Sequence, residues 1–238
     1  MLSRLVMSAY HREGLWYVMK QGVKYLAKLP YNLLAPWYHR IGRKQTFMFQ
    51  GEQYKYFYHA YNTTWNNPRA IEVPIIQRFI DRKRTLEVGC VLPHYISYHH
   101  DVVDLNEKYP DVINQDIADF KPNFRYDLVV SISTFEHIGD WGDEPKQPEK
   151  FLLAVHNVIS KVLGIGGHFV LTLPLGQNRD MDRYIYDGEV KFGELYCMRQ
   201  IDIKHNYWAE DSWEQIRREF RDGEWCGTQQ VILIGVMS

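Results

Sequence analysis

Residues 84–95 read RTLEVGCVLPHY, and this stretch decides the fold. Residues 85–88 have the apolar character of a short buried strand, and Gly89 ends it. A strand that runs into a glycine is typical of the start of a nucleotide-binding βα unit. The dinucleotide fingerprint, however, needs the pattern G-x-G-x-x-G, and only Gly89 stands here. Residues 84–95 therefore leave open whether a cofactor binds at this turn.

The composition is that of a globular protein without a strong charge. The chain has 238 residues, of which 45% are apolar, and a net charge of −1, so nothing indicates a nucleic-acid partner. Three cysteines without C-x-x-C spacing fit a reducing compartment and predict a cytoplasmic protein. No apolar run reaches the roughly 18 residues of a membrane span, and we expect no signal peptide.

Strand-like and helix-like patterns alternate along most of the chain. Strands are predicted at 85–88, 101–104, 111–114, 127–132, 168–173, 196–203 and 230–236. Helices are predicted at 69–82, 148–163 and 211–221. This alternation indicates an α/β domain with a mostly parallel sheet and right-handed crossovers.

Acidic residues stand where the second and third predicted strands end. Asp104 follows Gly89 by fifteen residues, about where a ribose-binding acid belongs. Asp116 could accept a hydrogen bond from an adenine amino group, with Ile117 packed on the ring. Each acid alone is most simply a solvated strand-end carboxylate, but their joint order and spacing favour a ligand site.

The sequence resembles the class I S-adenosylmethionine (SAM) dependent methyltransferases, of the type 11-like kind, over about residues 69–175. LEVGC, VVDLNE, NQDIADF, YDLVVSISTFEHIG and LGIGGHFVLTLPLG are similar to the five motifs of that class, in order. The resemblance implies a Rossmann-like, seven-stranded sheet with helices on both faces and an antiparallel last strand at 230–236. YNTTWNNPRAIEVPI and GCVLPHY also resemble putative methyltransferases found among glycan-assembly proteins.

The resemblance explains the missing glycines and implies SAM as cofactor. SAM has no pyrophosphate, so no glycine-rich loop has to cradle phosphates, which also disfavours an NAD-linked dehydrogenase. Only eleven residues separate Gly89 from Asp101, so the first crossover must be a very short helix or a turn around Pro93. The expected cofactor-binding residues are Glu72, Glu87, Gly89, Cys90, Asp104, Leu105, Asp116, Ile117, Ser133 and Thr134.

His137 is the candidate catalytic base, because it follows the fourth strand and its ordinary pKa suits proton transfer. A structural histidine is the equal alternative. Glu136 and His137 resemble part of a metal-binding Glu-x-x-Glu-His arrangement, but Ser133 replaces the first Glu, so we predict no metal. The histidines at 94, 99 and 100 match no defined metal site and are interpreted as loop residues.

Residues 1–45 are predicted to form a basic helical extension of a domain at 46–238. Residues 1–44 hold eight Lys or Arg but one acid, and Lys20, Lys24 and Lys28 share one helical face. The helix could anchor at a membrane surface, pack on the domain, or contact another protein. Residues 176–213 are expected to form the acceptor side, with Tyr184, Tyr186, Asp187 and Trp208 as candidate glycan contacts.

Together these patterns predict a methyltransferase that acts on a small-molecule or glycan acceptor, at oxygen. The alternative is a degenerate SAM-binding fold that serves as a scaffold in a membrane-associated glycan-assembly complex. A nucleic-acid methyltransferase is disfavoured, because no N-P-P-Y or D-P-P-Y motif follows the fourth strand. We expect a cytoplasmic protein with a possible peripheral membrane contact.

Overall fold

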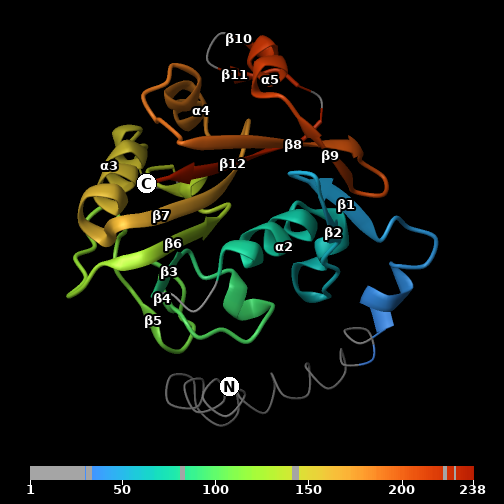
Figure 1. Cartoon of the computed structure of the whole chain (residues 1–238), viewed down its shortest axis with the longest axis horizontal. Helices are drawn as coiled ribbons and strands as arrows, with labels where there is room; N and C mark the ends of the chain where they lie inside the picture. The colour runs from blue at the N-terminus through green and yellow to red at the C-terminus, as the bar shows by residue number, and fades with distance from the viewer. Residues whose placement is uncertain (1–29, 31–33, 81–83, 141–144, 222–223, 228) are drawn as a thin grey trace.

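The structure is a computed structural model that describes residues 30, 34–80, 84–140, 145–221, 224–227 and 229–238. Its centre is an eight-stranded sheet in the order β5-β4-β3-β6-β7-β12-β8-β9 (Figure 1). The strands are β3 (Thr85–Val88), β4 (Asp101–Val103), β5 (Val112–Ile113), β6 (Tyr126–Ile132), β7 (Leu163–Pro174), β8 (Glu194–Asp202), β9 (Tyr207–Asp211) and β12 (Val231–Met237).

Strand directions confirm the predicted class I methyltransferase sheet. Strands β5, β4, β3, β6 and β7 pair in parallel, whereas β12 is antiparallel to both of its neighbours, β7 and β8. Seven of the strands therefore occupy the expected places. The eighth, β9, was not predicted, because its residues were assigned to an acceptor-side loop. A turn through Asn206, whose φ is +57°, folds β9 back onto β8 as an edge hairpin.

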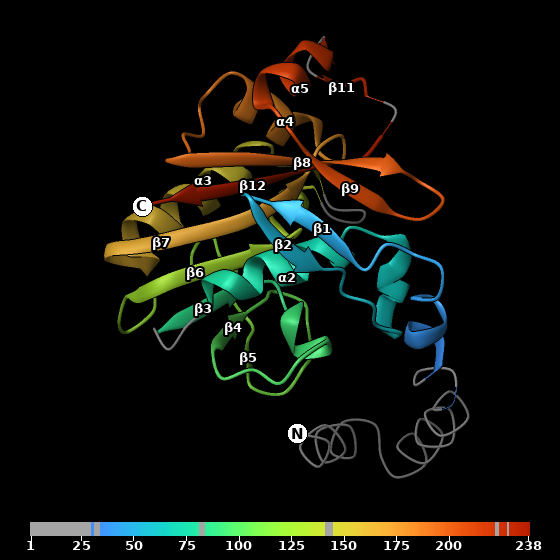
Figure 2. The ribbon, with the colours of Figure 1, turned by 45° about the vertical axis from the view of Figure 1, so that its right-hand side comes forward.

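Helices cover both faces of the sheet, as predicted (Figure 2). Helix α2 (Arg69–Phe79) packs its buried Val73 and Ile76 on the face formed by Leu128, Val130 and Ile132. The opposite face receives α3 (Glu149–Asn157), and α4 (Arg179–Tyr186) and α5 (Trp213–Glu219) contribute to the same core. Successive β6 side chains alternate between these cores, which is the period of a strand buried on both faces.

The helix predicted at 148–163 is shorter than expected. It ends at Asn157 and continues as one π-helical turn (Val158–Val162) before β7 begins at Leu163. Gly164, Gly166 and Gly167, which follow the predicted helix, lie inside β7. A Cβ at Gly167 would stand 2.9 Å from the carbonyl oxygen of Asp127, so this close approach of two strands requires glycine.

The first crossover contains a single 3₁₀ turn, η2 (Leu92–His94), as the short spacing predicted. A second short turn, η1 (Tyr61–Asn66), precedes α2, and a third, η3 (Phe135–His137), follows β6. The small pair β10 (Phe220–Arg221) and β11 (Glu224–Trp225) lies beyond α5.

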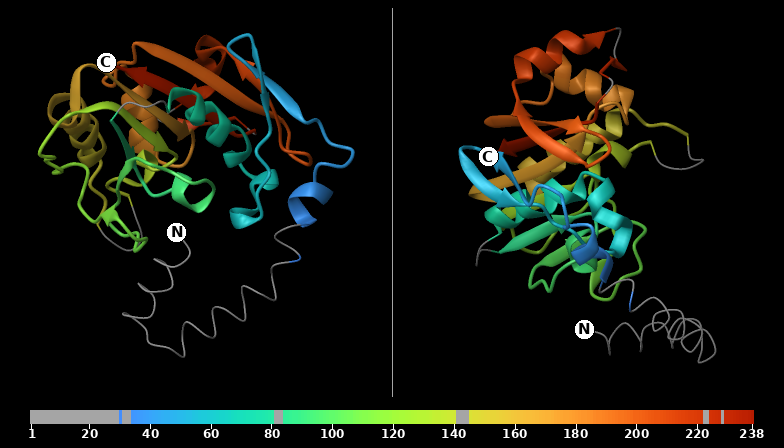
Figure 3. Two further views of the ribbon diagram at one scale, coloured as in Figure 1. Left: turned by 60° about the horizontal axis from the view of Figure 1, so that its bottom comes forward. Right: turned by 90° about the vertical axis from the view of Figure 1, so that its right-hand side faces the viewer.

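The N-terminal part of the described chain packs beside α2 and β9 (Figure 3). Strands β1 (Thr46–Phe49) and β2 (Glu52–Lys55) form a hairpin over a core that includes Trp65 and Trp208. The predicted basic face of Lys20, Lys24 and Lys28 lies outside the described residues. Within the described ranges, no helix is both long and apolar enough to cross a membrane.

Candidate functional site

A cavity of about 570 Å³ lies at the carboxyl ends of β3, β4 and β6. The strand order reverses between β3 and β6, and ligands of open α/β sheets bind beside such a switch point. Eight of the eleven predicted site residues line it: Gly89, Cys90, Asp104, Leu105, Asp116, Ile117, Thr134 and His137. The other three, Glu72, Glu87 and Ser133, do not.

Gly89 and Thr134 join the two strand ends at the inner side of the cavity. Gly89 has a φ of +86°, and a Cβ there would lie 2.1 Å from Thr134 Oγ1. Glycine is therefore required for two independent reasons, the backbone conformation and the contact. Within this chain, the group nearest to a side chain at position 89 would be that of Thr134.

Asp104 organises the loop around the cavity through backbone groups. Its Oδ1 accepts hydrogen bonds from the backbone N–H of Asn106 at 2.9 Å and of Glu107 at 2.8 Å. Its Oδ2 accepts from the N–H of Cys90 at 3.1 Å, which ties the ends of β3 and β4 together. A carboxylate offers about four acceptor positions, so Asp104 retains capacity for one further donor.

Asp116 and Ile117 reach the far wall of the cavity. Asp116 Oδ2 lies 2.6 Å from Lys150 Nζ of α3, and its Oδ1 accepts from the N–H of Ala118. This ion pair competes for the carboxylate that was predicted to receive an adenine amino group. Ile117 is buried and presents an apolar surface beside the exposed Leu105.

Glu87 is turned away from the cavity and caps the shortened crossover. Its Oε1 accepts from the N–H of Val91 at 2.9 Å and of Leu92 at 2.8 Å, while Oε2 lies 2.7 Å from His100 Nε2. Since the side chain is fully buried, these contacts satisfy a charge that would otherwise be costly. The carboxylate replaces the missing crossover helix as the element that holds the loop.

Glu72 is also fully buried and binds protein groups behind the cavity. It receives Arg69 Nη1 at 2.5 Å, Thr172 Oγ1 at 2.6 Å and a short hydrogen bond from Ser133 Oγ. Ser133 itself has a φ of +37°, a strained conformation for a residue with a side chain. The structure therefore places Glu72 and Ser133 as supports of the β6 end.

His137 lies on the cavity wall with its side chain 42% exposed. Burial, followed by the positive charge of Arg69, lowers its pKa from the usual 6.5, so the imidazole is neutral at about pH 7 and can accept a proton. Its neighbour Glu136 is almost fully buried, with Oε2 lacking a hydrogen-bond partner among the described residues. Burial raises the Glu136 pKa to about 8.

Sequence reasoning missed two charged residues of the cavity, Glu107 and Lys150. Glu107 lies in the quoted VVDLNE segment, three residues after Asp104, and its side chain is 37% exposed. That spacing after a strand-end acid is the signal that could have identified it. Lys150 could not have been paired with Asp116 from sequence, because the two are distant in the chain.

The expected glycan contacts on the acceptor side are not gathered into one surface. Trp208 is buried and donates its Nε1–H to Asn206 Oδ1. Tyr186 stacks on Phe220 with ring centroids 4.4 Å apart.

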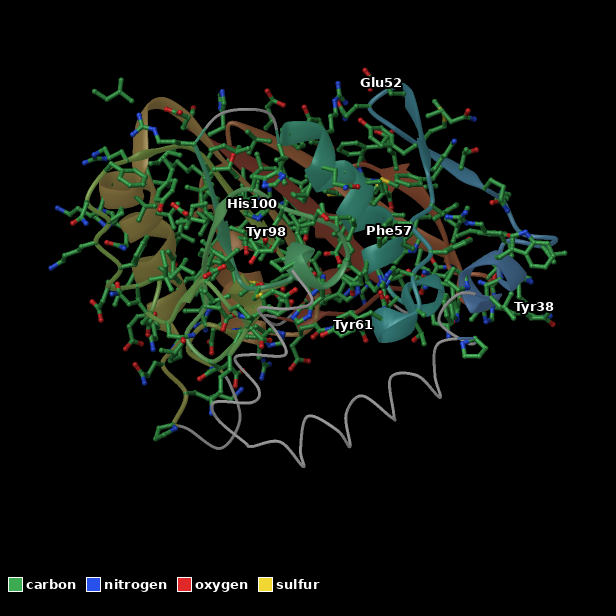
Figure 4. The ribbon with its side chains drawn as sticks, turned by 90° about the horizontal axis from the view of Figure 1, so that it is seen from below. Tyr38, Glu52, Phe57, Tyr61, Tyr98 and His100 are labelled. Atoms are coloured by element: carbon green, nitrogen blue, oxygen red, sulfur yellow. The ribbon has the colours of Figure 1, made fainter. Side chains whose placement is uncertain are left out.

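Tyr61 is an aromatic side chain that is 48% exposed close to the cavity. It stacks on His94 with ring centroids 4.6 Å apart, and His94 in turn contacts Glu107. Figure 4 shows Tyr61 on the lower surface of the molecule.

Aromatic and histidine side chains in this region have protein partners. Trp65 belongs to the core, and His100 is held by Glu87. Across the residues that the structure describes, no group of three or more His, Cys, Asp or Glu side chains is arranged to hold a metal ion.

The comparison with known proteins finds solved structures of similar fold and no related sequence. No family model and no curated protein matches the chain. A glycopeptide N-methyltransferase is 14% identical, covers 73% of this chain and 91% of its own, and has a TM-score of 0.37. A TehB-like SAM-dependent methyltransferase from Corynebacterium glutamicum is 17% identical, with 69% and 85% covered and a TM-score of 0.39.

A sugar N-methyltransferase from a Streptoalloteichus species is 16% identical over 64% of this chain and 66% of its own, with a TM-score of 0.36. All three scores lie below 0.5, so the fold assignment rests on the strand order of the chain itself. The order with an antiparallel β12 between β7 and β8 defines a Rossmann-like class I methyltransferase fold with one added edge strand.

Proposed function

We propose that the chain is a SAM-dependent methyltransferase whose acceptor is a small molecule or glycan, methylated at oxygen. The observation that carries the proposal is the cavity at the switch point between β3 and β6, in a sheet with class I strand order. The sequence motifs point to the same place, since residues from the first four of them line this cavity.

The residues around the cavity fit SAM in charge and shape. Asp104 and Glu107 offer carboxylate oxygens for the ribose hydroxyls, and their negative charge suits a cofactor that carries a sulfonium cation. Apolar side chains at Val88, Val103 and Ile117 suit the adenine ring. No row of glycines cradles a pyrophosphate at this turn, which argues for SAM over a dinucleotide.

When bound, SAM would supply an electrophilic methyl group on sulfur. The acceptor oxygen would form the new C–O bond as the C–S bond breaks, with the electron pair of that bond left on sulfur. His137 would take the hydroxyl proton, since its lowered pKa keeps the imidazole neutral. The remaining task of the protein is to hold the acceptor in line and to exclude water.

The runner-up is a degenerate SAM-binding fold that acts as a scaffold in a membrane-associated glycan-assembly complex. The Asp116–Lys150 ion pair favours it, because it occupies a carboxylate that the cofactor would otherwise use. In either case, contact of residues 1–44 with a membrane or a protein is a separate proposal that does not depend on the cofactor.

The proposed function is tested by methyl transfer from SAM with a labelled methyl group to nucleotide sugars and short glycans. We expect label in an acceptor with wild type and its loss with His137→Gln. Asp119→Ala is the matched control, since Asp119 is exposed and outside the cavity. A chain that binds SAM but labels none of these acceptors contradicts the acceptor class. A chain that does not bind SAM supports the scaffold.

A further inference from the structure

The segment that precedes β1 has one side fixed to the domain and one side in solvent. Residues 34–38 are helical and a turn follows at 39–42. Ala35 is buried, His39 stacks on Trp65 with centroids 4.2 Å apart, and Arg43 Nη1 donates to the carbonyls of Trp65 and His205 at 3.3 Å. These contacts at i, i+4 and i+8 hold one side of the segment on the domain.

The other side exposes large apolar side chains, and we call them the apolar ridge. They are Leu34, Trp37, Tyr38 and Ile41, with exposed fractions of 62%, 65%, 68% and 59%. Leu34, Trp37 and Tyr38 share one face of the helix by their spacing of i, i+3 and i+4, and Ile41 follows in the turn. Figure 4 shows Tyr38 at the outer edge of the molecule. Adjacent large apolar side chains that are exposed together mark an interaction site.

The charge around the apolar ridge indicates its partner. No acid occurs between Glu13 and Glu52, and Arg40 is exposed within the segment that carries the ridge. Trp and Tyr side chains favour the boundary between lipid headgroups and acyl chains, and exposed cations are attracted to anionic headgroups. A partner protein would supply a groove for the ridge, but an acid-free, aromatic and basic segment matches a lipid surface in both charge and polarity.

We propose that the apolar ridge docks the protein on an anionic membrane surface, with its side chains inserted at headgroup depth and Arg40 against the lipid phosphates. This inference goes beyond the methyltransferase proposal and stands without it. His39 stacks on Trp65 of η1, and Tyr61 of the same turn stacks on His94 near the cavity. The docking face is therefore connected through η1 to His94, whose Nε2 lies 3.6 Å from Oε2 of the cavity residue Glu107.

Co-sedimentation of the full chain with lipid vesicles tests the proposal. We expect binding to vesicles of phosphatidylcholine with phosphatidylserine, weaker binding to phosphatidylcholine alone, and weakening by salt. The double variant W37S/I41S should lose at least about tenfold in partitioning, because two large apolar side chains no longer insert. The matched control L153S/I165S, which replaces exposed apolar side chains of α3 and β7, should bind as wild type does.

Arg40→Glu provides a second variant that leaves the apolar side chains in place, and it should weaken binding to the anionic vesicles several-fold. Thermal unfolding of each variant checks that the fold is intact. Equal binding by wild type and W37S/I41S would overturn the proposal, as would wild type that binds neither vesicle. A dimer that W37S/I41S converts to a monomer would also overturn it and assign the ridge to a second copy of the chain.

Discussion

Gly89 and Thr134 touch across the point where the sheet reverses its strand order. A Cβ at Gly89 would lie 2.1 Å from Thr134 Oγ1 and 2.7 Å from its Cγ2, and Gly89 has a φ of +86°. The contact joins the end of β3 to the end of β6 and closes the inner side of the cavity. The Thr134 side chain occupies the space that a side chain at position 89 would need, so this position has to be glycine.

Gly89→Ala should destabilise the fold by about 1–3 kcal/mol more than Gly188→Ala does, because it adds a steric clash to the backbone strain. Gly188 is a matched control, since it has a φ of +76° but open space around its Cβ position. Chemical denaturation of both variants measures the difference. Equal losses of stability would show that Thr134 moves aside without cost.

Glu72→Gln should lower the free energy of unfolding by about 3–5 kcal/mol, because Arg69 then stays in a largely buried place without its partner charge. The affinity for SAM should change much less, since Glu72 does not line the cavity. Denaturation and calorimetry on the same sample separate the two effects. A folded Glu72→Gln protein with wild-type stability and no SAM binding would restore the predicted direct contact.

His137→Gln should reduce the rate of methyl transfer by about 10²–10⁴-fold if the imidazole takes the acceptor proton. Because burial lowers the His137 pKa from 6.5, the wild-type rate should hold at neutral pH and fall only at a pH below 6.5. The rate is followed across pH with an acceptor found by screening. A variant with full activity would assign His137 a structural role.

Glu136→Gln should flatten the dependence of stability on pH. Burial raises the Glu136 pKa from 4.5 to about 8, so the folded state holds a proton that the unfolded chain releases. The stabilisation is therefore complete below the unfolded pKa and is lost as pH rises toward 8, by on the order of 5 kcal/mol. Urea denaturation of wild type and variant at several pH values measures it. Asp182, whose pKa is raised to about 7, acts in the same direction in both proteins.

A wild-type protein whose stability does not decline across that range would contradict the buried protonated state of Glu136. If the decline persists unchanged in Glu136→Gln, the pH dependence belongs to Asp182 instead. Asp182→Asn then provides the comparison, because Asp182 Oδ1 is the other buried carboxylate oxygen without a partner among the described residues.

The sequence predicted the sheet well because its strands are buried on both faces and read as continuous apolar runs. The positions of β3, β6, β8 and β12 all agree with expectation to within two residues. The added strand β9 could not be read in the same way. It is a partly exposed edge strand, and its pairing with β8 depends on a turn through Asn206 rather than on apolar periodicity.

The candidate site was predicted from motif positions, and the directions of its side chains were not. The alternation of side chains along a strand predicts the face on which Glu87 lies. It does not predict that the carboxylate accepts hydrogen bonds from the N–H groups of Val91 and Leu92. The same holds for Glu72, whose partner Thr172 lies 100 residues away in the chain. Protein groups therefore hold both of these carboxylates, which were predicted to bind the cofactor.

The central claim is that SAM binds in the cavity between β3 and β6, and a calorimetric titration of the full chain with SAM tests it most directly. We predict binding in the micromolar range, about −8 kcal/mol, for wild type and for Asp119→Ala. Asp104→Ala should bind at least about tenfold more weakly, through the lost ribose contact and the released N–H groups. Folded wild-type protein that shows no binding up to about a millimolar SAM, roughly −4 kcal/mol, would contradict the account.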